Sequence, residues 1–311
     1  MIFPTYFDSK KSLSLYGLDE NFHILKNLYI KNLLPKVLML SGKKGSGKAT
    51  LVNHLMFFIF DKDNYDEKNN KLVNKSDFYK QFLNNIFENI IYLSGSDFNN
   101  IKIEDIRNLK KKIYQTLISN KPRFIILDDI ELFNNNSLNA LLKAIEEPTK
   151  NNYFLLINNN TKPMLETIKS RSLEIKIILN NKKKAQIVKS LVNNFNLNLT
   201  LNLDYTNITP GNFLKFNYIF DENKISLEDD FIKNLTIILH LYKKNKDVVY
   251  IDLILFLTNF HFNSLKINNI VSKEKLIEHK RFVFENVNKF FLYNLNQNAL
   301  INAINNKIIN E

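Results

Sequence analysis

The sequence predicts an α/β domain with a mostly parallel sheet, followed by regions built of helices. Three observations predict this fold class. Short apolar runs alternate with amphipathic stretches through the first half of the 311 residues, as in chains of βαβ units. A glycine-rich loop separates the first apolar run from a helical stretch. Beyond about residue 180 the strand signal fades and a helical period dominates.

Five strands are predicted from apolar runs of four to six residues, a common strand length. They are expected at residues 37–40, 90–93, 124–127, 154–157 and 173–178. The first four have the continuous apolar character of buried strands. In the fifth, Glu174 and Lys176 alternate outward, which is typical of an edge strand.

Helices are predicted between and after these strands. One is expected over 50–60, after the glycine loop, and another over 182–195. From about residue 226 the chain is expected to be helical. A period of 3.6 residues is clearest through Phe231, Leu235, Ile238, Leu239 and Tyr242. The polar, Asn-rich residues 61–89 look like an insertion, and Thr209-Pro210-Gly211 predicts a turn.

Composition excludes several classes of site. The sequence contains no cysteine, which excludes disulfides, a cysteine nucleophile and a zinc site made of cysteines, and fits a reducing cytoplasm. The N-terminal stretch has no continuous apolar segment, and the run 55–60 is far too short to span a bilayer. We therefore expect a soluble, cytoplasmic protein with no membrane partner.

The net charge of +12 favours a polyanionic partner such as nucleic acid. A second explanation is that the charge follows from residue usage. Only four of the 43 basic residues are Arg, and Asn, Lys and Ile dominate the chain, as an AT-rich coding sequence would give. Charge alone leaves both explanations open.

Residues 42–50, GKKGSGKAT, nearly match the phosphate-binding pattern G-x-x-x-x-G-K-[ST]. Gly42, Gly47 and Lys48 meet the pattern, and Gly45 lies between them. Such glycines let backbone N–H groups turn toward an anion, the next helix adds its dipole, and Lys48 supplies a charge. The alternative is a glycine-rich turn without a ligand.

Asp128 and Asp129 follow an apolar strand about eighty residues after the loop. In P-loop proteins an acid at such a strand end holds magnesium, and a second acid orients the attacking water. Asp129 is one methylene shorter than the Glu that is usual in hydrolysing motors. The alternative is a solvated acidic turn.

An amphipathic helix is predicted next. Its apolar positions are spaced i, i+3, i+4 and i+7, at Leu138, Leu141, Leu142 and Ile145. Asn136 or Ser137 is expected to cap the helix, and Pro148 follows its end. Asn139 and Lys143 are expected on the exposed face, where they contact solvent, a neighbouring protein or DNA.

Arg171 lies in TIKSRS, residues 167–172, directly before the predicted edge strand. A lone Arg is usually a surface residue. In a chain with four Arg, one flanked by small polar residues at a domain edge is a functional candidate, because the fixed fork of a guanidinium suits phosphate.

Together these stretches resemble the AAA+ clamp-loader family, densely over residues 15–178 and weakly beyond about 220. The blocks that carry the resemblance are LYGLDENFHILKNLYIKNLLPKVLMLSGKKGSGKATL, IRNLKKKIYQTL, FIILDDIELFNNNSLNALLKAIEEP and LLINNNTKPMLETIKSRS. The resemblance implies an α/β AAA+ P-loop domain with a parallel sheet over 1–178, a small helical lid domain over 179–222 and an all-α collar domain for oligomerisation over 223–311.

The resemblance also implies partners. Members of this family form a heteropentameric ring, here with subunits of the gamma/tau and delta types, that opens a sliding clamp and seats it on primed DNA. This chain would then touch primer-template DNA indirectly or weakly, within a replisome associated with the nucleoid.

By position, Arg171 matches the family's arginine finger, which reaches the ATP site of a neighbouring subunit, and Asn158 matches the first sensor position. Two features depart from the family. Asn212 stands in TPGNFLKF where the second-sensor arginine would fall. Many relatives carry four zinc-binding cysteines between the loop helix and the second strand, whereas residues 61–89 contain none, so no zinc is expected.

These residues bear on ATP hydrolysis, which needs a magnesium-binding hydroxyl, an acid that positions water and positive charge on the γ-phosphate. Ala49 lacks the hydroxyl, although Thr50 could partly substitute if the helix register shifted. Asp129 weakens the second requirement and Asn212 the third. We expect ATP with Mg²⁺ to be weakly bound or not hydrolysed. An active gamma/tau-like ATPase and a stand-alone P-loop ATPase that binds nucleic acid remain alternatives.

Overall fold

The computed structural model describes residues 3–96, 103–115, 121–202, 208–267 and 272–309. The chain divides into two compact units. The α/β unit contains Ile2–Asn196 and Thr209–Gly211, and the helical unit contains Leu197–Ile208 and Asn212–Glu311. The three predicted domains stay a prediction.

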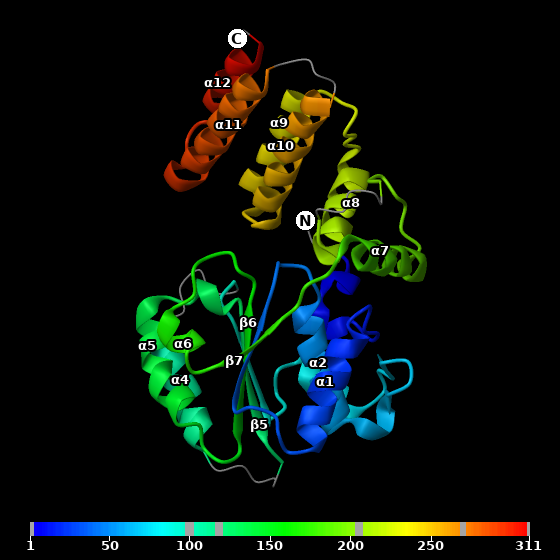
Figure 1. The fold of residues 1–311 in the computed structure, drawn as a ribbon, viewed down its shortest axis with the longest axis vertical. Coiled ribbons are helices and arrows are strands. Elements are labelled where there is room, and N and C mark those ends of the chain that lie inside the picture. Colours follow the sequence, from blue (N-terminus) through cyan, green and yellow to red (C-terminus); the bar gives the residue numbers. More distant parts are fainter. Residues whose placement is uncertain (1–2, 97–102, 116–120, 203–207, 268–271, 310–311) are drawn as a thin grey trace. The chain divides into compact units, whose positions relative to one another are not determined.

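A five-stranded parallel sheet forms the centre of the α/β unit (Figure 1). Its strands, in spatial order, are β4 (Ile90–Ser94), β5 (Arg123–Asp128), β6 (Asn152–Asn158), β1 (Val37–Ser41) and β7 (Leu173–Lys176). Every neighbouring pair is parallel. The carboxyl ends of all five strands therefore meet at one edge of the sheet, where α/β proteins usually bind ligands.

Helices cover both faces of this sheet (Figure 1). The helices α1 (Asp19–Ile30) and α2 (Lys48–Phe60) lie on one face, and α4 (Ile103–Tyr114), α5 (Asn135–Glu146) and α6 (Glu166–Lys169) lie on the other. Each face has its own buried apolar cluster. The predicted fold class, an α/β domain with a parallel sheet followed by helices, is confirmed.

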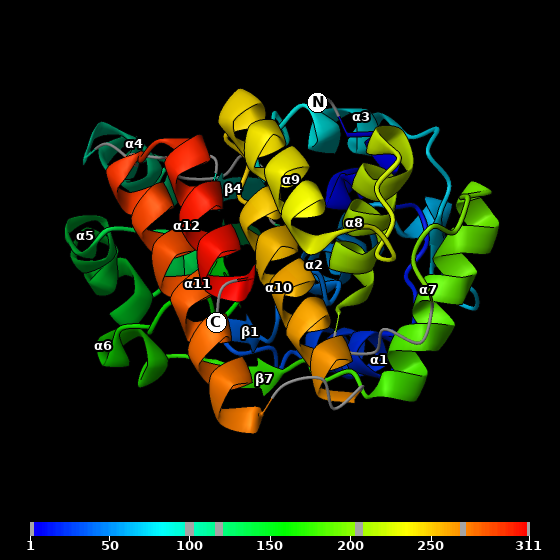
Figure 2. The same ribbon diagram turned by 90° about the horizontal axis from the view of Figure 1, so that it is seen from above.

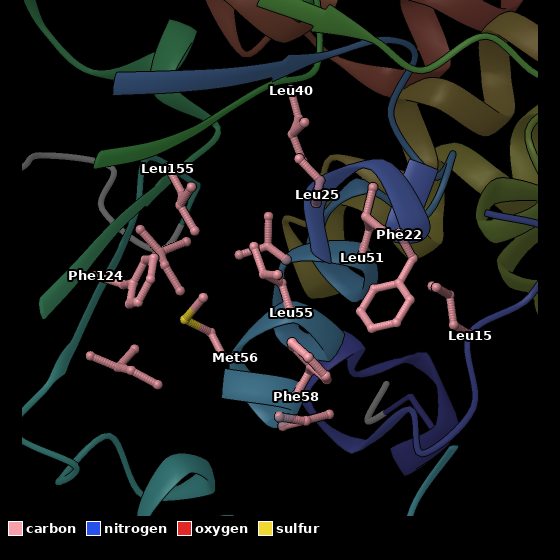
Figure 3. Packing of buried hydrophobic residues seen from close by; sticks show 14 of the residues in the cluster. Leu15, Phe22, Leu25, Leu40, Leu51, Leu55, Met56, Phe58, Phe124 and Leu155 are labelled. Carbon is pink, nitrogen blue, oxygen red and sulfur yellow. The ribbon is translucent and has the colours of Figure 1, made fainter. Parts of the chain in front are cut away.

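The cluster under α2 joins this helix to the sheet and to α1. In Figure 3, Leu55 and Met56 of α2 lie beside Phe124 and Leu155 of the sheet, and all four are at most 1% exposed. On the other side, Phe22 of α1 packs edge-on against Phe58 of α2. The helix is apolar on nearly all sides because it is enclosed between these layers.

Residues 61–89 form a small structure against α2. It contains a one-turn helix η3 (Lys62–Asn64), the antiparallel pair β2 (Tyr65–Asp66) and β3 (Lys71–Leu72), and the helix α3 (Asp77–Leu83). Phe78, Tyr79 and Phe82 of α3 are buried around Phe57 of α2, with ring centroids 5.1–6.4 Å from it. This segment is polar in composition, yet its aromatic side chains form a buried core with α2.

Three local predictions need correction. The cap of α5 is Asn134, whose side chain accepts from Ser137 N, rather than Asn136 or Ser137 itself. Pro210 is the first residue of α8 (Pro210–Asn223) rather than the middle of a turn, because proline suits the first position of a helix. The strand β4 is an edge strand with three half-buried residues rather than a buried strand. The predicted edge position of the strand at 173–178 is confirmed by β7.

Short elements and one further helix complete the α/β unit. The one-turn helices η1 (Thr5–Phe7) and η2 (Ser9–Lys11) precede α1, and η4 (Ile130–Leu132) follows β5. After β7, the predicted helix at 182–195 is α7 (Asn181–Phe195), which is capped by Asn180.

In the helical unit, α8 is followed by α9 (Phe231–Asn245), α10 (Val249–Ile267), α11 (Lys273–Tyr293) and α12 (Gln297–Ile309). These last four helices lie side by side (Figure 2). The periodic residues Phe231, Leu235, Ile238 and Leu239 are buried, as their spacing predicts. None of the helices in the described part of the chain is long and apolar enough to cross a membrane.

Candidate phosphate-binding loop and arginine site

The loop after β1 turns sharply with glycines at the strained positions. Gly45 and Gly47 have φ of 79° and 90°, which side chains disfavour. At Gly42 a Cβ atom would lie 2.5 Å from the carbonyl oxygen of Ile177. The three glycines are therefore required by the path of the loop.

Backbone donors of this loop are available to an anion. Among the described residues, none accepts a hydrogen bond from the backbone N–H groups of Gly45, Gly47, Lys48 or Ala49. The helix α2 begins at Lys48, so its positive dipole end faces the same place. Unpaired N–H groups at a helix start are the usual cradle for a phosphate.

Lys48 lies inside the loop and is 2% exposed. Its Nζ donates to the carbonyl oxygens of Gly42 at 2.7 Å and Lys43 at 2.9 Å, and to Oγ of Ser46 at 3.4 Å. Burial lowers the pKa of Lys48 to about 8, although the carboxylates of Asp128 and Glu131 act in the opposite direction. The ammonium of Lys48 is thus held by three hydrogen bonds. The nearby carboxylates do not offset the cost of burying its charge.

Residues 209–211, distant in the sequence, form hydrogen bonds with the carbonyl groups of the loop. Oγ1 of Thr209 donates to the carbonyl of Lys44 at 2.6 Å, and the N–H of Gly211 donates to the carbonyl of Gly45 at 2.9 Å. A Cβ on Gly211 would lie 3.0 Å from Cα of Gly45. These bonds use loop carbonyls, so they leave the N–H groups free for an anion.

A basic cavity of about 610 Å³ borders the loop next to β7. Its wall contains Ser46 of the loop and Asn158 at the end of β6. Four lysines line it together with one carboxylate, and they are Lys43, Lys169, Lys176 and Lys184, with Glu174. The excess of positive charge suits an anionic ligand.

Asp128, predicted to hold magnesium, and Asp129, predicted to orient the attacking water, both have other partners. Asp128 accepts from the hydroxyl of Tyr92 at 2.6 Å and from the N–H of Asp129 at 2.8 Å, and burial raises its pKa. Asp129 is buried with a left-handed φ of 48°, and it accepts from the amide of Asn159 at 2.6 Å. Both carboxylates are therefore engaged with the protein itself.

The residues present fit a phosphate but not a magnesium ion. Ala49 has no hydroxyl and packs against the buried cluster under α2. Thr50 lies in the first turn of α2. No group of three or more His, Cys, Asp or Glu side chains that could hold a metal is found in the described part of the chain. The loop thus presents backbone N–H groups and one ammonium, and no hydroxyl at position 49.

Asn158 adjoins the loop at the end of β6. Its carbonyl accepts from the N–H of Gly42 at 3.1 Å, while its side chain accepts from the N–H of Asn160 at 2.9 Å. Gly42, Gly45, Gly47, Lys48 and Asn158 thus share one edge of the sheet with Asp128 and Asp129. Asn212 lies on α8, in the helical unit.

Glu131 is a buried acid that sequence reasoning missed. Its Oε1 accepts from the N–H of Asn159 at 3.1 Å and from the N–H and hydroxyl of Thr161 at 3.3 and 2.8 Å. It thereby holds the loop that follows β6. The signal in the sequence was a third acid two residues after Asp129, inside an otherwise apolar stretch.

Arg171 lies apart from the loop. It stands between α6 and β7, before Leu173, and Leu173 pairs with Leu38 of the parallel strand β1. The loop follows the other end of β1. At about 3.3 Å per residue, the five residues of β1 separate the two by roughly 16 Å. Arg171 is therefore at the opposite end of the sheet from its own loop.

The guanidinium of Arg171 is held by its own unit. Nη2 lies 2.9 Å from Oε1 of Glu146, at the end of α5. Nη1 donates to the carbonyl of Thr167 at 2.9 Å and to Oγ of Ser170 at 3.3 Å. The Arg171 side chain remains 37% exposed.

Comparison with known proteins finds a matching family model and similar relatives. A family model described as "DNA polymerase III, delta subunit" matches residues 17–181. In Buchnera aphidicola subsp. Schizaphis graminum, DNA polymerase III subunit delta' is 29% identical over 193 residues, which are 56% of this chain and 54% of the relative. Subunit gamma of the same organism is 29% identical over 137 residues, 41% of this chain and 38% of the relative.

A solved structure of a gamma subunit-related protein from Thermotoga maritima is 14% identical, with a TM-score of 0.39 over 93% of this chain and 97% of that one. The chain spans about half or less of the length of the two Buchnera relatives.

Proposed function

The chain belongs to the DNA polymerase III delta subunit family, and from this premise we propose that it acts as a delta-prime-type subunit of a clamp loader. In that role it helps to load a sliding clamp onto primed DNA during replication. It contributes Arg171 to the ATP site of a neighbouring subunit rather than hydrolysing ATP efficiently itself.

The position of Arg171 is the observation that supports this proposal most. Arg171 lies roughly 16 Å along the sheet from its own phosphate-binding loop, too far for contact with a phosphate held there. More than a third of its side chain is exposed, just before the start of an edge strand. A guanidinium so placed is available to a second protein, and guanidinium groups supplied by a partner stabilise phosphoryl transfer.

The chain's own loop has the features of a holding site. Its N–H groups and Lys48 suit the phosphates of ATP, but Ala49 and the engaged carboxylate of Asp128 do not suit Mg²⁺. We therefore assign binding of phosphate to the loop and no hydrolytic step to the residues around it.

The proposed partners are subunits of the gamma/tau and delta types in a heteropentameric ring. The predicted collar, residues 223–311, would join that ring through α9–α12. Contact with the clamp and with primer-template DNA would be made mainly through the ring, in a replisome at the nucleoid. The positive net charge of +12 is favourable for work beside a polyanion.

Reconstitution tests this proposal. The purified chain is mixed with the gamma/tau-type and delta-type subunits of its own organism, and complex formation is followed by size-exclusion chromatography. We expect one complex whose ATPase is stimulated by clamp and primed DNA. A chain that stays monomeric and shows ATPase stimulated by nucleic acid alone would instead be a stand-alone P-loop ATPase.

A further inference from the structure

The guanidinium of Arg171 is held between two helices on the same face of the sheet. Glu146 is the last residue of α5, and its Oε1 lies 2.9 Å from Nη2. Thr167, in α6, accepts from Nη1 at 2.9 Å. The side chains of Arg171 and Glu146 are 37% and 39% exposed, so the pair lies at the surface rather than in the core.

We propose that Glu146 is a positioning residue, which holds the guanidinium of Arg171 in the orientation that reaches a phosphate of the neighbouring subunit's nucleotide. The inference rests on the proposed function of Arg171 in trans. Glu146 acts through Arg171 and has no contact with the phosphate itself.

Some N–H donors of Arg171 bind its own unit and others remain for a phosphate, which fits a positioning role for Glu146. A guanidinium carries five N–H groups. Those of Nη1 face Thr167 and Ser170, and Glu146 holds one side of Nη2. Donors on Nε and Nη2 remain for an incoming phosphate. A free Arg side chain samples many rotamers, so fixing it beforehand removes an entropic cost from the transition state.

The ion pair is also weak enough to permit the reaction. Half-exposed ion pairs contribute little to stability and are screened by salt. A triphosphate carries more negative charge than one carboxylate and competes effectively for the same guanidinium. Glu146 therefore orients Arg171 without withholding it.

Glu147 provides a matched control. It is the neighbouring residue, it is exposed, and no ion pair joins it to any described residue. Substituting Glu147→Gln changes the net charge by the same amount as Glu146→Gln, at a position that does not touch Arg171.

The experiment measures clamp loading by rings reconstituted with the cognate subunits. With Glu146→Gln we expect normal assembly, unchanged affinity of the ring for ATP, and clamp loading slower by about two- to five-fold, which corresponds to about 0.4–1 kcal/mol. Glu146→Asp, whose carboxylate is one methylene shorter, should show the same direction. Glu147→Gln should load clamps at the unmodified rate.

A double-mutant cycle separates positioning from a general structural role. In rings that carry Arg171→Ala, adding Glu146→Gln should change nothing further. An unchanged or faster rate with Glu146→Gln, or an equal loss with Glu147→Gln, would overturn the inference. So would a further loss in the Arg171→Ala background. If Arg171→Ala alone loads clamps normally, the proposed function fails first, and Glu146 has nothing to position.

Discussion

Lys48 is an ammonium group enclosed by its own loop, and its pKa is lowered to about 8 by burial. A phosphate binds the charged form of Lys48, so affinity depends on the fraction that is protonated. That fraction is high at pH 7 and falls as the pH rises through 8. The loop should therefore bind phosphate less well in alkaline solution.

The first prediction concerns this pH dependence. Between pH 7 and pH 9 the affinity of the isolated chain for ATP should fall by about tenfold, because binding weakens with the population of the competent form. Isothermal titration calorimetry measures it. Lys48→Met should bind weakly at both pH values. Lys43→Met, on the exposed side of the loop, should keep the pH dependence. Equal affinity at pH 7 and pH 9 in the unmodified chain would refute it.

The second prediction is a low intrinsic ATPase. The purified chain should turn over ATP far more slowly than the roughly 1–100 s⁻¹ typical of kinases. Ala49→Thr alone should not restore turnover, because Asp128 remains engaged by Tyr92. A steady-state phosphate-release assay measures this. A rate within that range that disappears in Lys48→Ala would identify the chain as an active gamma/tau-like ATPase.

At the scale of elements, residues 61–89 are attached to α2 by aromatic packing. Phe57 is fully buried and touches the rings of Phe78, Tyr79 and Phe82. Such contacts add to the free energy gained by burying apolar area. The segment therefore has an apolar core of its own where many relatives of the resembled family are expected to bind zinc.

The third prediction tests that attachment. Phe57→Ala should lower the free energy of unfolding by about 3–5 kcal/mol, the usual cost of a large core deletion. Tyr114→Ala, at a position 57% exposed, should change it by less than about 0.5 kcal/mol. Denaturant unfolding measures both. Treatment with EDTA should leave the Tm of the unmodified chain unchanged, and a clear fall would reveal a bound metal.

Elements could be predicted from the sequence where a local pattern identifies them. The strands are apolar runs, and the loop is marked by three of the six glycines. The order of the strands in the sheet depends on pairing between distant residues, which a local sequence pattern does not reveal. The edge position of β4 was therefore not predicted. The aromatic core of residues 61–89 was missed because its rings stand among Asn, Lys and Asp. Tyr92 and Glu131 were missed because their partners lie on other elements.

At the scale of the whole molecule, the helical unit exposes large apolar side chains near the end of α11. Leu292 and Tyr293 are 76% and 71% exposed. Neighbouring exposed apolar residues are common at protein–protein contacts. In the proposed ring, this part of the predicted collar is a natural place for a neighbouring subunit.

The fourth prediction follows from this surface. Leu292→Glu combined with Tyr293→Glu should leave the Tm of the isolated chain nearly unchanged, because neither side chain is in the core. The variant should assemble poorly with its cognate subunits in size-exclusion chromatography. Ile86→Glu, at an exposed position of the α/β unit, should assemble normally. Normal assembly of the double variant would place the contact elsewhere.

The central claim is that Arg171 works on the ATP site of a neighbour. Negative charge builds on the transferred phosphoryl group, and a guanidinium supplied in trans can be worth about 10³–10⁵ in rate at that site. This chain would complete one site among several. Arg171→Lys should rescue little, because an ammonium does not reproduce the fork of the guanidinium.

The most direct measurement is the clamp-loading rate of assembled rings that carry Arg171→Ala, with total ATPase measured in the same rings. Folding and assembly should be intact, since Arg171 contributes to a surface ion pair and not to the core. We predict a sharp fall in clamp loading with a partial fall in total ATPase. Clamp loading at the unmodified rate would show that Arg171 is a surface residue and would contradict the account.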